Sequence, residues 1–476
     1  MMPDNNQYDI CIIGAGAGGL TVAAATSQFG LKVALVEGHK MGGDCLNYGC
    51  VPSKALLASA KHYFDAKYSE KYGFEFEAKS VDIKNVMAKI REIIATIAPH
   101  DSVERFSNLG VSVYQGNGSF VDNDTIKVGD QLIKAKYFVI ATGSRPVVPS
   151  IPGINDVNYL TNETIFELNE TPEHLIVMGG GPIGCELAQA FLMLGIKVTV
   201  LSLRKILPKD ETDLVNLLRQ EIKGQGLNLY EDIKIIKIIK KESGIELIIE
   251  DNGVEQIISG SHLLVATGRI PSLDKLNLEA ANIKYTPKGV IVDERLRTSN
   301  KRIFAIGDVA GSYQFTHIAS YHAGIVIRNI VFRQRAKVNY LAVPWATYTY
   351  PVLAHVGLLE RDAEIKYADD IKISEFEYSE NDRAQAERLT IGKIKLITTK
   401  KGKVLGVSIL GANADDLLSP WIDIINRGET VKALSKNITP YPTLGEINKQ
   451  VVGEYYKPIL FSPKVKLLVK FLKWFW

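Results

Sequence analysis

The sequence predicts an α/β protein in which two Rossmann-like dinucleotide-binding domains are followed by an α+β domain. A buried strand, a glycine-rich turn and a helix follow one another at residues 8–30 and again at residues 174–201, the pattern of a dinucleotide-binding fold. From about residue 340 strands and helices continue without a glycine fingerprint, which indicates a different kind of domain. At 476 residues the chain exceeds what one hydrophobic core usually supports, so several domains are expected.

In the first unit the strand YDICII runs directly into GAGAGG and then into a helix predicted to end at Gly30. Its fingerprint glycines are Gly14, Gly16 and Gly19. Glycines at this spacing allow a tight turn and a close approach of a pyrophosphate to the helix N-terminus. The next strand, LKVALV, ends at Glu37, whose carboxylate can accept hydrogen bonds from ribose hydroxyls.

The second unit repeats this pattern with the glycines Gly179, Gly181 and Gly184. Glu37 lies 23 residues after the first glycine of its fingerprint, and the residue at that distance in the second unit is Ser202. Arg204 and Lys205 follow it. An acid that would repel a 2′-phosphate is missing and two cations stand nearby, which favours NADPH over NADH. The alternative is that the two cations belong to a solvated loop.

Other strands also end in candidate cofactor contacts. The motif ATG at residues 141–143 recurs at 266–268, so the chain is expected to leave both nucleotide-binding units by the same kind of crossing. The segment AIGDVAG places Asp308 at the carboxyl end of a strand, where it can meet a ligand's hydroxyls, or where it is a simple turn aspartate. The candidates from these segments are Gly143, Gly268 and Asp308, and Gly118 is a further candidate cofactor contact.

The stretch GGDCLNYGCVPSK at residues 42–54 contains Cys45, Cys50 and Lys54. The two thiols can form a small ring disulfide if a turn brings their Cα atoms within about 4.4–6.8 Å. Gly49 and Pro52 supply turn chemistry. No further close cysteine or histidine pair completes a zinc site, so no metal site is expected. Two unrelated buried thiols are the alternative.

Composition limits the partners and the compartment. With 46% hydrophobic residues, 23% charged residues and a net charge of +3, the chain is typical of a soluble globular protein. It has no concentrated basic patch with interleaved aromatics, so nucleic acid is not expected as a partner. The first ten residues lack the features of a secretory signal, and four cysteines do not make an extracellular scaffold. We expect a cytoplasmic protein, in which a disulfide is more often catalytic than structural.

Taken together, the cysteine motif, the two fingerprints, the two ATG turns and AIGDVAG resemble the pyridine nucleotide-disulfide oxidoreductases with a Cys-x4-Cys centre, over residues 8–455. This group includes dihydrolipoamide dehydrogenase, glutathione reductase and mercuric reductase. The resemblance implies bound FAD, hydride transfer from NAD(P)H through FAD to a Cys45–Cys50 disulfide, and a homodimer. It implies that Cys45 attacks the substrate, that Cys50 lies beside the flavin, and that Lys54 pairs with Glu186. An ordinary helix-surface acid is the alternative for Glu186.

The resemblance also implies the division of the chain. The expected parts are an FAD-binding domain (first part, 1–150), an NAD(P)H-binding domain (151–270), a second FAD-binding or central part (271–340), an interface domain (341–455) and a tail (456–476).

The sequence departs from most members of the family at residues 441–446, which read YPTLGE where they carry His-Pro-Thr-x-x-Glu. Tyr441 and Glu446 are therefore candidate catalytic residues supplied by the partner subunit, and all eight histidines lie at or before His355. A phenol with a pKa near 10 is a poor general base at neutral pH, whereas a histidine has a pKa near 6.5. Reduction of disulfide substrates should suffer most, which favours a metal ion, a quinone or an unknown oxidant as acceptor. Tyr441 could instead be mere packing at the interface.

Several functions stay open at this stage. A tyrosine at this position is similar to mercuric reductase, but that family's extra cysteine pair is missing, because no cysteine follows Cys185. Dihydrolipoamide dehydrogenase is the alternative enzyme. A non-catalytic, redox-sensing or membrane-associated flavoprotein is the alternative from another class, and the intact cysteine pair weighs against it.

The last segment, KVKLLVKFLKWFW at residues 464–476, predicts a short basic amphipathic helix. Lys466, Lys470 and Lys473 share a narrow sector of its wheel. Thirteen residues are too few to span a bilayer, so the segment is expected either to lie in a membrane interface or to pack on the partner subunit.

Overall fold

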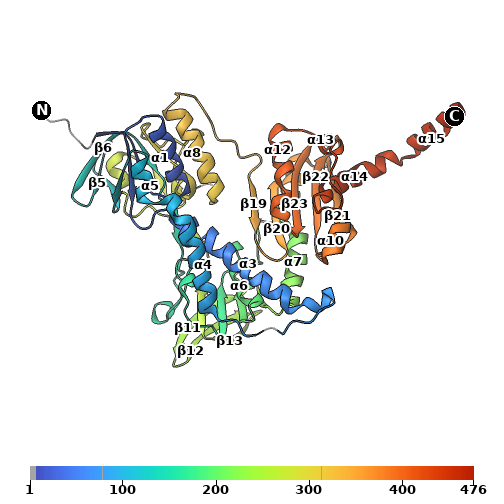
Figure 1. The fold of residues 1–476 in the computed structure, drawn as a ribbon, viewed down its shortest axis with the longest axis horizontal. Helices are drawn as coiled ribbons and strands as arrows, with labels where there is room; N and C mark the ends of the chain where they lie inside the picture. Colours follow the sequence, from blue (N-terminus) through green and yellow to red (C-terminus); the bar gives the residue numbers. More distant parts are fainter. Residues whose placement is uncertain (1–6, 78, 312) are drawn as a thin grey trace.

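The computed structural model describes residues 7–77, 79–311 and 313–476. Three lobes surround a central junction, and the last helix projects away from the body of the chain (Figure 1). The lobes correspond to two sheets with Rossmann-like strand order and one antiparallel sheet, so the predicted α/β fold is confirmed.

The first lobe is built on a sheet with strand order β3-β2-β1-β6-β5-β4, with β18 paired to β6. Its strands are β1 (Gln7–Ile13), β2 (Val33–Glu37), β3 (Val111–Gln115), β4 (Gly118–Phe120), β5 (Thr125–Val128), β6 (Gln131–Ile140) and β18 (Ile303–Ala305). The pairs among β1, β2, β3, β6 and β18 are parallel, whereas β4 and β5 form an antiparallel extension. Helices α1 (Ala17–Gln28) and α8 (Thr316–Ile330) pack against each other on this sheet, and α5 (Val103–Asn108) contacts β3.

The second lobe repeats the parallel arrangement with strand order β10-β9-β8-β14. Its strands are β8 (His174–Met178), β9 (Lys197–Leu201), β10 (Asn228–Tyr230) and β14 (His262–Val265). An antiparallel ribbon of β11 (Lys234–Lys241), β12 (Gly244–Asp251) and β13 (Val254–Gly260) lies beside it, and its helices are α6 (Pro182–Met193) and α7 (Thr212–Gly224).

The sequence predicts that the chain leaves the two nucleotide-binding units through similar segments, and these two segments pair with each other. The segment after each ATG turn forms a short strand, β7 (Ser144–Pro146) or β15 (Arg269–Pro271), and the two strands are antiparallel partners. The chain therefore leaves and re-enters the first lobe through one two-stranded hinge.

The third lobe has an antiparallel sheet with strand order β19-β20-β23-β22-β21. Its strands are β19 (Pro344–Thr347), β20 (Val352–Gly357), β21 (Ile371–Glu377), β22 (Lys393–Thr399) and β23 (Val404–Gly411). Its helices are α9 (Glu360–Tyr367), α10 (Asp382–Glu387), α11 (Ala414–Leu417), α12 (Ser419–Arg427), α13 (Lys432–Ser435) and α14 (Glu446–Leu460), and α15 (Pro463–Leu472) follows as the projecting helix.

Three further helices connect the lobes. They are α2 (Gly43–Asn47), α3 (Cys50–Lys67) and α4 (Ile83–Ile97), and the remaining short strands are β16 (Tyr285–Thr286) and β17 (Gly289–Val290). Helix α3 packs on α4 of its own lobe and on α6 of the second lobe. One hydrophobic core runs through this contact, from Leu56 and Met87 to Leu187 and on to Leu353 of the third lobe. The cysteine motif at the start of α3 thus sits where all three lobes meet.

Candidate active site

The first glycine of each fingerprint makes the turn out of its first strand. Gly14 has φ +108° and Gly179 has φ +122°, values that residues with a side chain rarely adopt. A Cβ on Gly14 would lie 2.4 Å from the oxygen of Ala141, and one on Gly179 would lie 2.3 Å from the oxygen of Ala266. The two turns therefore have the same construction.

The other glycines divide their roles in the same way in both units. A Cβ on Gly19 would lie 1.9 Å from the oxygen of Gly14, and a Cβ on Gly184 would lie 2.0 Å from the oxygen of Gly179. The absence of a side chain at these two positions lets the helix contact the turn. A Cβ on Gly16 or Gly181 would have no neighbour closer than 4.0 Å. The space in front of these middle glycines fits a pyrophosphate at each helix N-terminus.

A cavity of about 1980 Å³ joins both fingerprints to the cysteine motif. The predicted cofactor residues that line it are Gly14, Gly16, Glu37, Gly118, Gly143, Gly179, Gly181, Arg204, Lys205, Gly268 and Asp308. The predicted catalytic residues that line it are Cys45, Cys50, Lys54 and Glu186. Gly19 and Gly184 do not line it, because they lie behind the turns.

Two carboxylates stand at strand ends facing this cavity. Glu37 at the end of β2 accepts hydrogen bonds from the backbone N–H of Ala15 at 2.6 Å and of His39 at 2.7 Å. Asp308 accepts one from the Ser144 hydroxyl at 2.5 Å, and burial raises the pKa of its carboxyl group. Both acids are held in place beside the cavity, and their contact with ribose-like hydroxyls stays a prediction.

The two cations of the second unit have different surroundings. Arg204 and Lys205 both line the cavity, but the Lys205 ammonium is 2.8 Å from the Asp232 carboxylate, which raises the lysine pKa. Ser202, where the first unit has an acid, is buried. A phosphate ligand would have to compete with Asp232 for Lys205.

The cysteine pair is in the dithiol form, with Cys45 in α2 and Cys50 at the first position of α3. The Cys45 thiol, the Thr316 hydroxyl 3.3 Å from Cys50 Sγ, and the positive charge of Lys54 together lower the pKa of Cys50 to about 6. The aligned peptide dipoles at the start of α3 act in the same direction. Hydrogen bonding to Cys50 and burial raise the pKa of Cys45. At neutral pH the pair therefore consists of a Cys50 thiolate and a Cys45 thiol.

Lys54 and Glu186 form the predicted ion pair, although they come from different lobes. Lys54 Nζ donates to Glu186 Oε2 at 2.7 Å, and Glu186 is only 5% exposed. The backbone N–H of Tyr348 in the third lobe donates to Glu186 Oε1 at 3.0 Å, and the Tyr348 ring lies 4.2 Å from Lys54 Nζ. Glu186 is therefore a buried partner of the cation beside the cysteines, not a surface acid.

A second, smaller cavity of about 400 Å³ also reaches the cysteine pair. Cys45 lines both cavities, whereas Cys50 lines the larger one. Asp101 and Arg105 contribute charges to the smaller cavity, and burial raises the pKa of the Asp101 carboxyl group. Cys45 thus also borders a space that none of the fingerprint glycines lines.

Tyr441 and Glu446 lie apart from the cysteines within one chain. Tyr441 is 71% exposed and its hydroxyl donates to Asp382 Oδ2 at 2.7 Å. Glu446 is the first residue of α14 in the third lobe. Neither residue lines either cavity, so any contact between them and the thiols has to come from a second copy of the chain.

Sequence reasoning missed several residues that the fold brings to the site. Thr316 reaches Cys50, Tyr348 covers Lys54, and Arg269 approaches Asp44 at 3.2 Å beside the cysteine motif. Thr316 is 266 residues away from Cys50, and no local motif marks it. Arg269 directly follows the second ATG turn, so its position in a repeated motif was the one available signal.

Comparison with known proteins decides the family. The family model described as pyridine nucleotide-disulphide oxidoreductase matches residues 8–323, and the model of its dimerisation domain matches residues 343–452. The chain belongs to this family. The matches confirm the predicted resemblance.

Relatives cover nearly the whole chain. Mercuric reductase of Staphylococcus aureus is 35% identical over 445 residues, which cover 93% of this chain and 81% of the relative. Dihydrolipoyl dehydrogenase of Geobacillus stearothermophilus is 35% identical over 452 residues, which cover 93% and 94%. Among solved structures, the Cu(II) complex of the HOCl-induced flavoprotein disulfide reductase RclA from Escherichia coli has a TM-score of 0.85 at 26% identity, covering 94% of this chain and 99% of that one.

These relatives establish an FAD-dependent NAD(P)H oxidoreductase, as predicted. When bound, FAD supplies two-electron transfer between a pyridine nucleotide and the cysteine pair. The open middle glycines and the acid at the end of β2 fit such a dinucleotide at the first fingerprint. The match to the dimerisation domain supports a homodimer.

Proposed function

We propose that this enzyme passes electrons from NADPH to a small, thiol-reactive acceptor, with a soft metal ion as the first candidate. Cys45 and Cys50 act as the redox-active pair, with Cys45 as the thiol that meets the acceptor. Lys54, held by Glu186, keeps positive charge beside the pair. The chain is divided at the boundaries expected from the sequence, and the partner subunit supplies Tyr441 and Glu446.

The thiolate and thiol next to the smaller cavity carry this proposal. Soft sulfur ligands favour thiophilic ions such as Cu(I). Cys45 opens on a space of about 400 Å³, and Cys50 is a thiolate at neutral pH. Such a pair can bind and reduce a small ion without a base to remove a proton first.

The tyrosine at position 441 favours a metal ion over a disulfide as the electron acceptor. Reduction of a disulfide requires a proton at the leaving sulfur, and the Asp382 carboxylate raises the pKa of Tyr441 further above its usual range. The names of the relatives support both kinds of acceptor, since a mercuric reductase and a dihydrolipoyl dehydrogenase are each 35% identical to this chain. The structural neighbour was solved with Cu(II) bound. The extra C-terminal cysteines expected of a specialised mercury enzyme are absent from the sequence.

An acceptor panel tests the proposal. The flavin-loaded enzyme is reduced anaerobically with NADPH and then offered Cu(II), Hg(II), a quinone, glutathione disulfide or lipoamide. We expect turnover with a metal ion to exceed turnover with both disulfides, and to be lost in the Cys45→Ser variant. Faster turnover of lipoamide than of either ion would instead identify a dihydrolipoamide dehydrogenase.

NADPH is the proposed reductant because of the second fingerprint. Arg204 and Lys205 line the cavity where a 2′-phosphate would lie, and Ser202 brings no negative charge. The pairing of Lys205 with Asp232 makes Arg204 the principal phosphate ligand in this proposal. NADH is the alternative reductant.

We propose a cytoplasmic enzyme whose C-terminal tail contacts the membrane surface. No residue of α15 is buried, and the helix stands away from the rest of the chain (Figure 1). Residues 455–476 contain five lysines and no acid, and the aromatic rings of Phe471, Trp474, Phe475 and Trp476 are exposed. Apolar side chains beside lysines suit an anionic lipid interface. None of the helices formed by the described residues combines the length and apolarity needed to cross a bilayer.

Vesicle sedimentation tests the tail. We expect the full chain to sediment with vesicles of anionic phospholipid and much less with neutral ones, and deletion of residues 462–476 to abolish this. Replacing Lys466, Lys470 and Lys473 with glutamate should have the same effect while α15 remains. Unchanged sedimentation of the deletion variant, or a change from dimer to monomer in light scattering, would assign the tail to the partner subunit.

A further inference from the structure

The loop between β9 and α7, residues 202–211, forms one wall of the large cavity. It carries Arg204 and Lys205 near its start, and most of its remaining residues, up to Asp210, also face the cavity. We call this segment the nucleotide loop. Its shape decides where the two cations stand relative to the second fingerprint.

Within its own lobe the nucleotide loop is hydrogen-bonded to the second fingerprint at Gly180. The backbone N–H of Leu207 donates to the oxygen of Gly180 at 2.9 Å, and that of Ile206 donates to Glu231 Oε1 at 2.7 Å. Leu207 has φ +45°, which is unfavourable for a leucine. Near its start the loop is also held by the bond from the Ser202 N–H to the oxygen of Tyr230 at 2.9 Å and by the ion pair of Lys205 with Asp232 at 2.8 Å, so support from elsewhere matters most for its second half.

The third lobe supplies that support. Trp345 Nε1 donates to Asp210 Oδ1 at 2.7 Å, and the Arg361 guanidinium donates to the oxygen of Pro208 at 3.3 Å. The backbone N–H of Glu360, at the start of α9, donates to Glu211 Oε1 at 2.7 Å. Three residues of the dimerisation domain thus hold the second half of a loop that belongs to the nucleotide-binding lobe.

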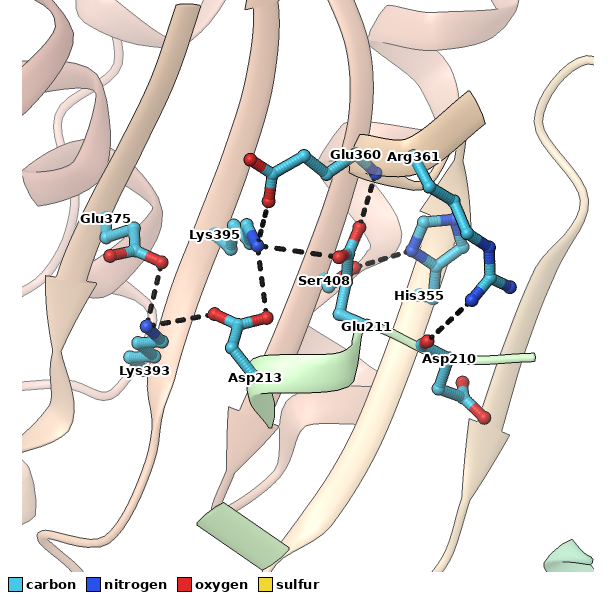
Figure 2. A network of polar contacts seen from close by, with 10 residues as sticks. All are labelled: Asp210, Glu211, Asp213, His355, Glu360, Arg361, Glu375, Lys393, Lys395 and Ser408. Carbon is cyan, nitrogen blue, oxygen red and sulfur yellow. Dashed lines mark hydrogen bonds and ion pairs between the residues drawn. The ribbon is translucent and has the colours of Figure 1, made fainter. Parts of the chain in front are cut away.

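Lys395 on β22 is the charge at the centre of these contacts (Figure 2). Its ammonium lies 3.4 Å from Glu211, 3.0 Å from Asp213 and in contact with Glu360, and its side chain is 6% exposed. These three carboxylates raise the pKa of Lys395 despite its burial. Figure 2 shows the end of the nucleotide loop and the start of α9 converging on this one cation.

Removal of the cation would leave three carboxylates facing one another in a poorly solvated space. Like charges so placed repel, and a buried unpaired charge is costly. Glu360 and Lys395 belong to the third lobe, whereas Glu211 is the last residue of the nucleotide loop, so the repulsion acts on that loop. Loss of Lys395 should therefore displace the loop that carries Arg204.

We propose that Lys395 is a positioning residue for the pyridine nucleotide, acting from the dimerisation domain through Glu211 on the nucleotide loop. This inference rests on the proposed nucleotide site at the second fingerprint. It predicts that nucleotide affinity depends on a residue that touches neither the nucleotide nor the cysteines.

The test compares three variants of the flavin-loaded dimer. In Lys395→Met we expect the Kd of NADP+ and the KM of NADPH to rise at least fivefold while kcat changes less than twofold. Lys395→Arg keeps the charge and should recover most of the affinity. Lys393→Met is the matched control. Lys393 lies two residues away on β22 and pairs with Asp213 and Glu375, but not with Glu211. In this variant the Kd of NADP+ should therefore change less than twofold.

An unchanged Kd in a Lys395→Met dimer with full flavin content would overturn the inference. If that variant does not fold, Glu211→Gln decides, because it keeps an acceptor for the Glu360 N–H but loses the charge that Lys395 holds. We expect its Kd to rise at least twofold, and no rise would reject the role of Lys395. A wild-type enzyme that binds no pyridine nucleotide would instead refute the proposed nucleotide site itself.

Discussion

At the scale of single residues, the chemistry of the cysteine pair depends on which thiol gives up its proton first. Three neighbours stabilise the anion on Cys50, and one of them, Cys45, does so by keeping its own proton. In the proposed mechanism, the Cys45 nucleophile is then generated by proton exchange within the pair. Lys54 can stay close to this anion because the buried Glu186 carboxylate holds its ammonium in place.

Alkylation kinetics should report this order of ionisation. In the reduced enzyme, iodoacetamide should modify Cys50 in proportion to its thiolate, so the rate should fall as pH drops through about 6, where the thiolate takes up a proton. Lys54→Met and Thr316→Val each remove a stabilising partner and should move the midpoint to higher pH. Peptide mass spectrometry measures the modification. An unmoved midpoint in both variants would show that neither group stabilises the thiolate.

The contributions of Arg204 and Lys205 to NADPH binding can be distinguished by substituting each residue in turn. A charged hydrogen bond to a phosphate contributes about 1.5–3 kcal/mol, and 1.4 kcal/mol corresponds to a tenfold change in affinity. We expect Arg204→Leu to raise the KM of NADPH about tenfold or more and to leave that of NADH almost unchanged. Lys205→Leu should have a smaller effect because Asp232 already holds this lysine. Equal losses for both nucleotides would mean that neither cation reads the 2′-phosphate.

At the scale of elements, the fingerprints show what the sequence could and could not predict. The strand, turn and helix of both units were predictable because each glycine answers a local steric demand, as Gly14 and Gly19 do. The pairing of β7 with β15 and the approach of Thr316 to Cys50 were not, because they join segments more than 100 residues apart. Lys395 carried no local signal either, since its partners lie on the nucleotide loop, α7 and α9.

Substitution of the third glycine of one fingerprint should impair nucleotide binding at that fingerprint only. In Gly184→Ala the new methyl group would lie about 2.0 Å from the oxygen of Gly179, so helix and turn must separate. We expect NADP+ affinity to fall tenfold or more with flavin content retained, as measured by calorimetry and absorbance. Gly224→Ala at the end of α7 is the control, because its methyl group meets no atom and should stabilise the helix by about 0.5–1 kcal/mol. Loss of flavin in Gly184→Ala would contradict separate roles for the two fingerprints.

At the scale of the whole molecule, the proposed role of Tyr441 requires the dimer. The cysteines lie where the three lobes of one chain meet, whereas Tyr441 stands exposed on the third lobe. We propose that in the dimer Tyr441 of one subunit lies near the cysteine pair of the other, where the residue at position 441 would determine the proton supply to Cys45. If so, the choice of acceptor depends on dimer formation as well as on the thiols.

Replacing Tyr441 with histidine should therefore change the acceptor preference. An imidazole with a pKa near 6.5 can exchange a proton near neutral pH, and a positioned general acid–base contributes about 10²–10⁴-fold. We expect Tyr441→His to raise lipoamide and glutathione disulfide reduction at least tenfold and to leave metal-ion reduction within threefold, measured as kcat/KM. Tyr441→Phe, which keeps the ring but removes the hydroxyl, should leave both activities near those of the wild type. No gain with either disulfide in a stable Tyr441→His dimer would mean that Tyr441 serves interface packing and that another group moves the proton.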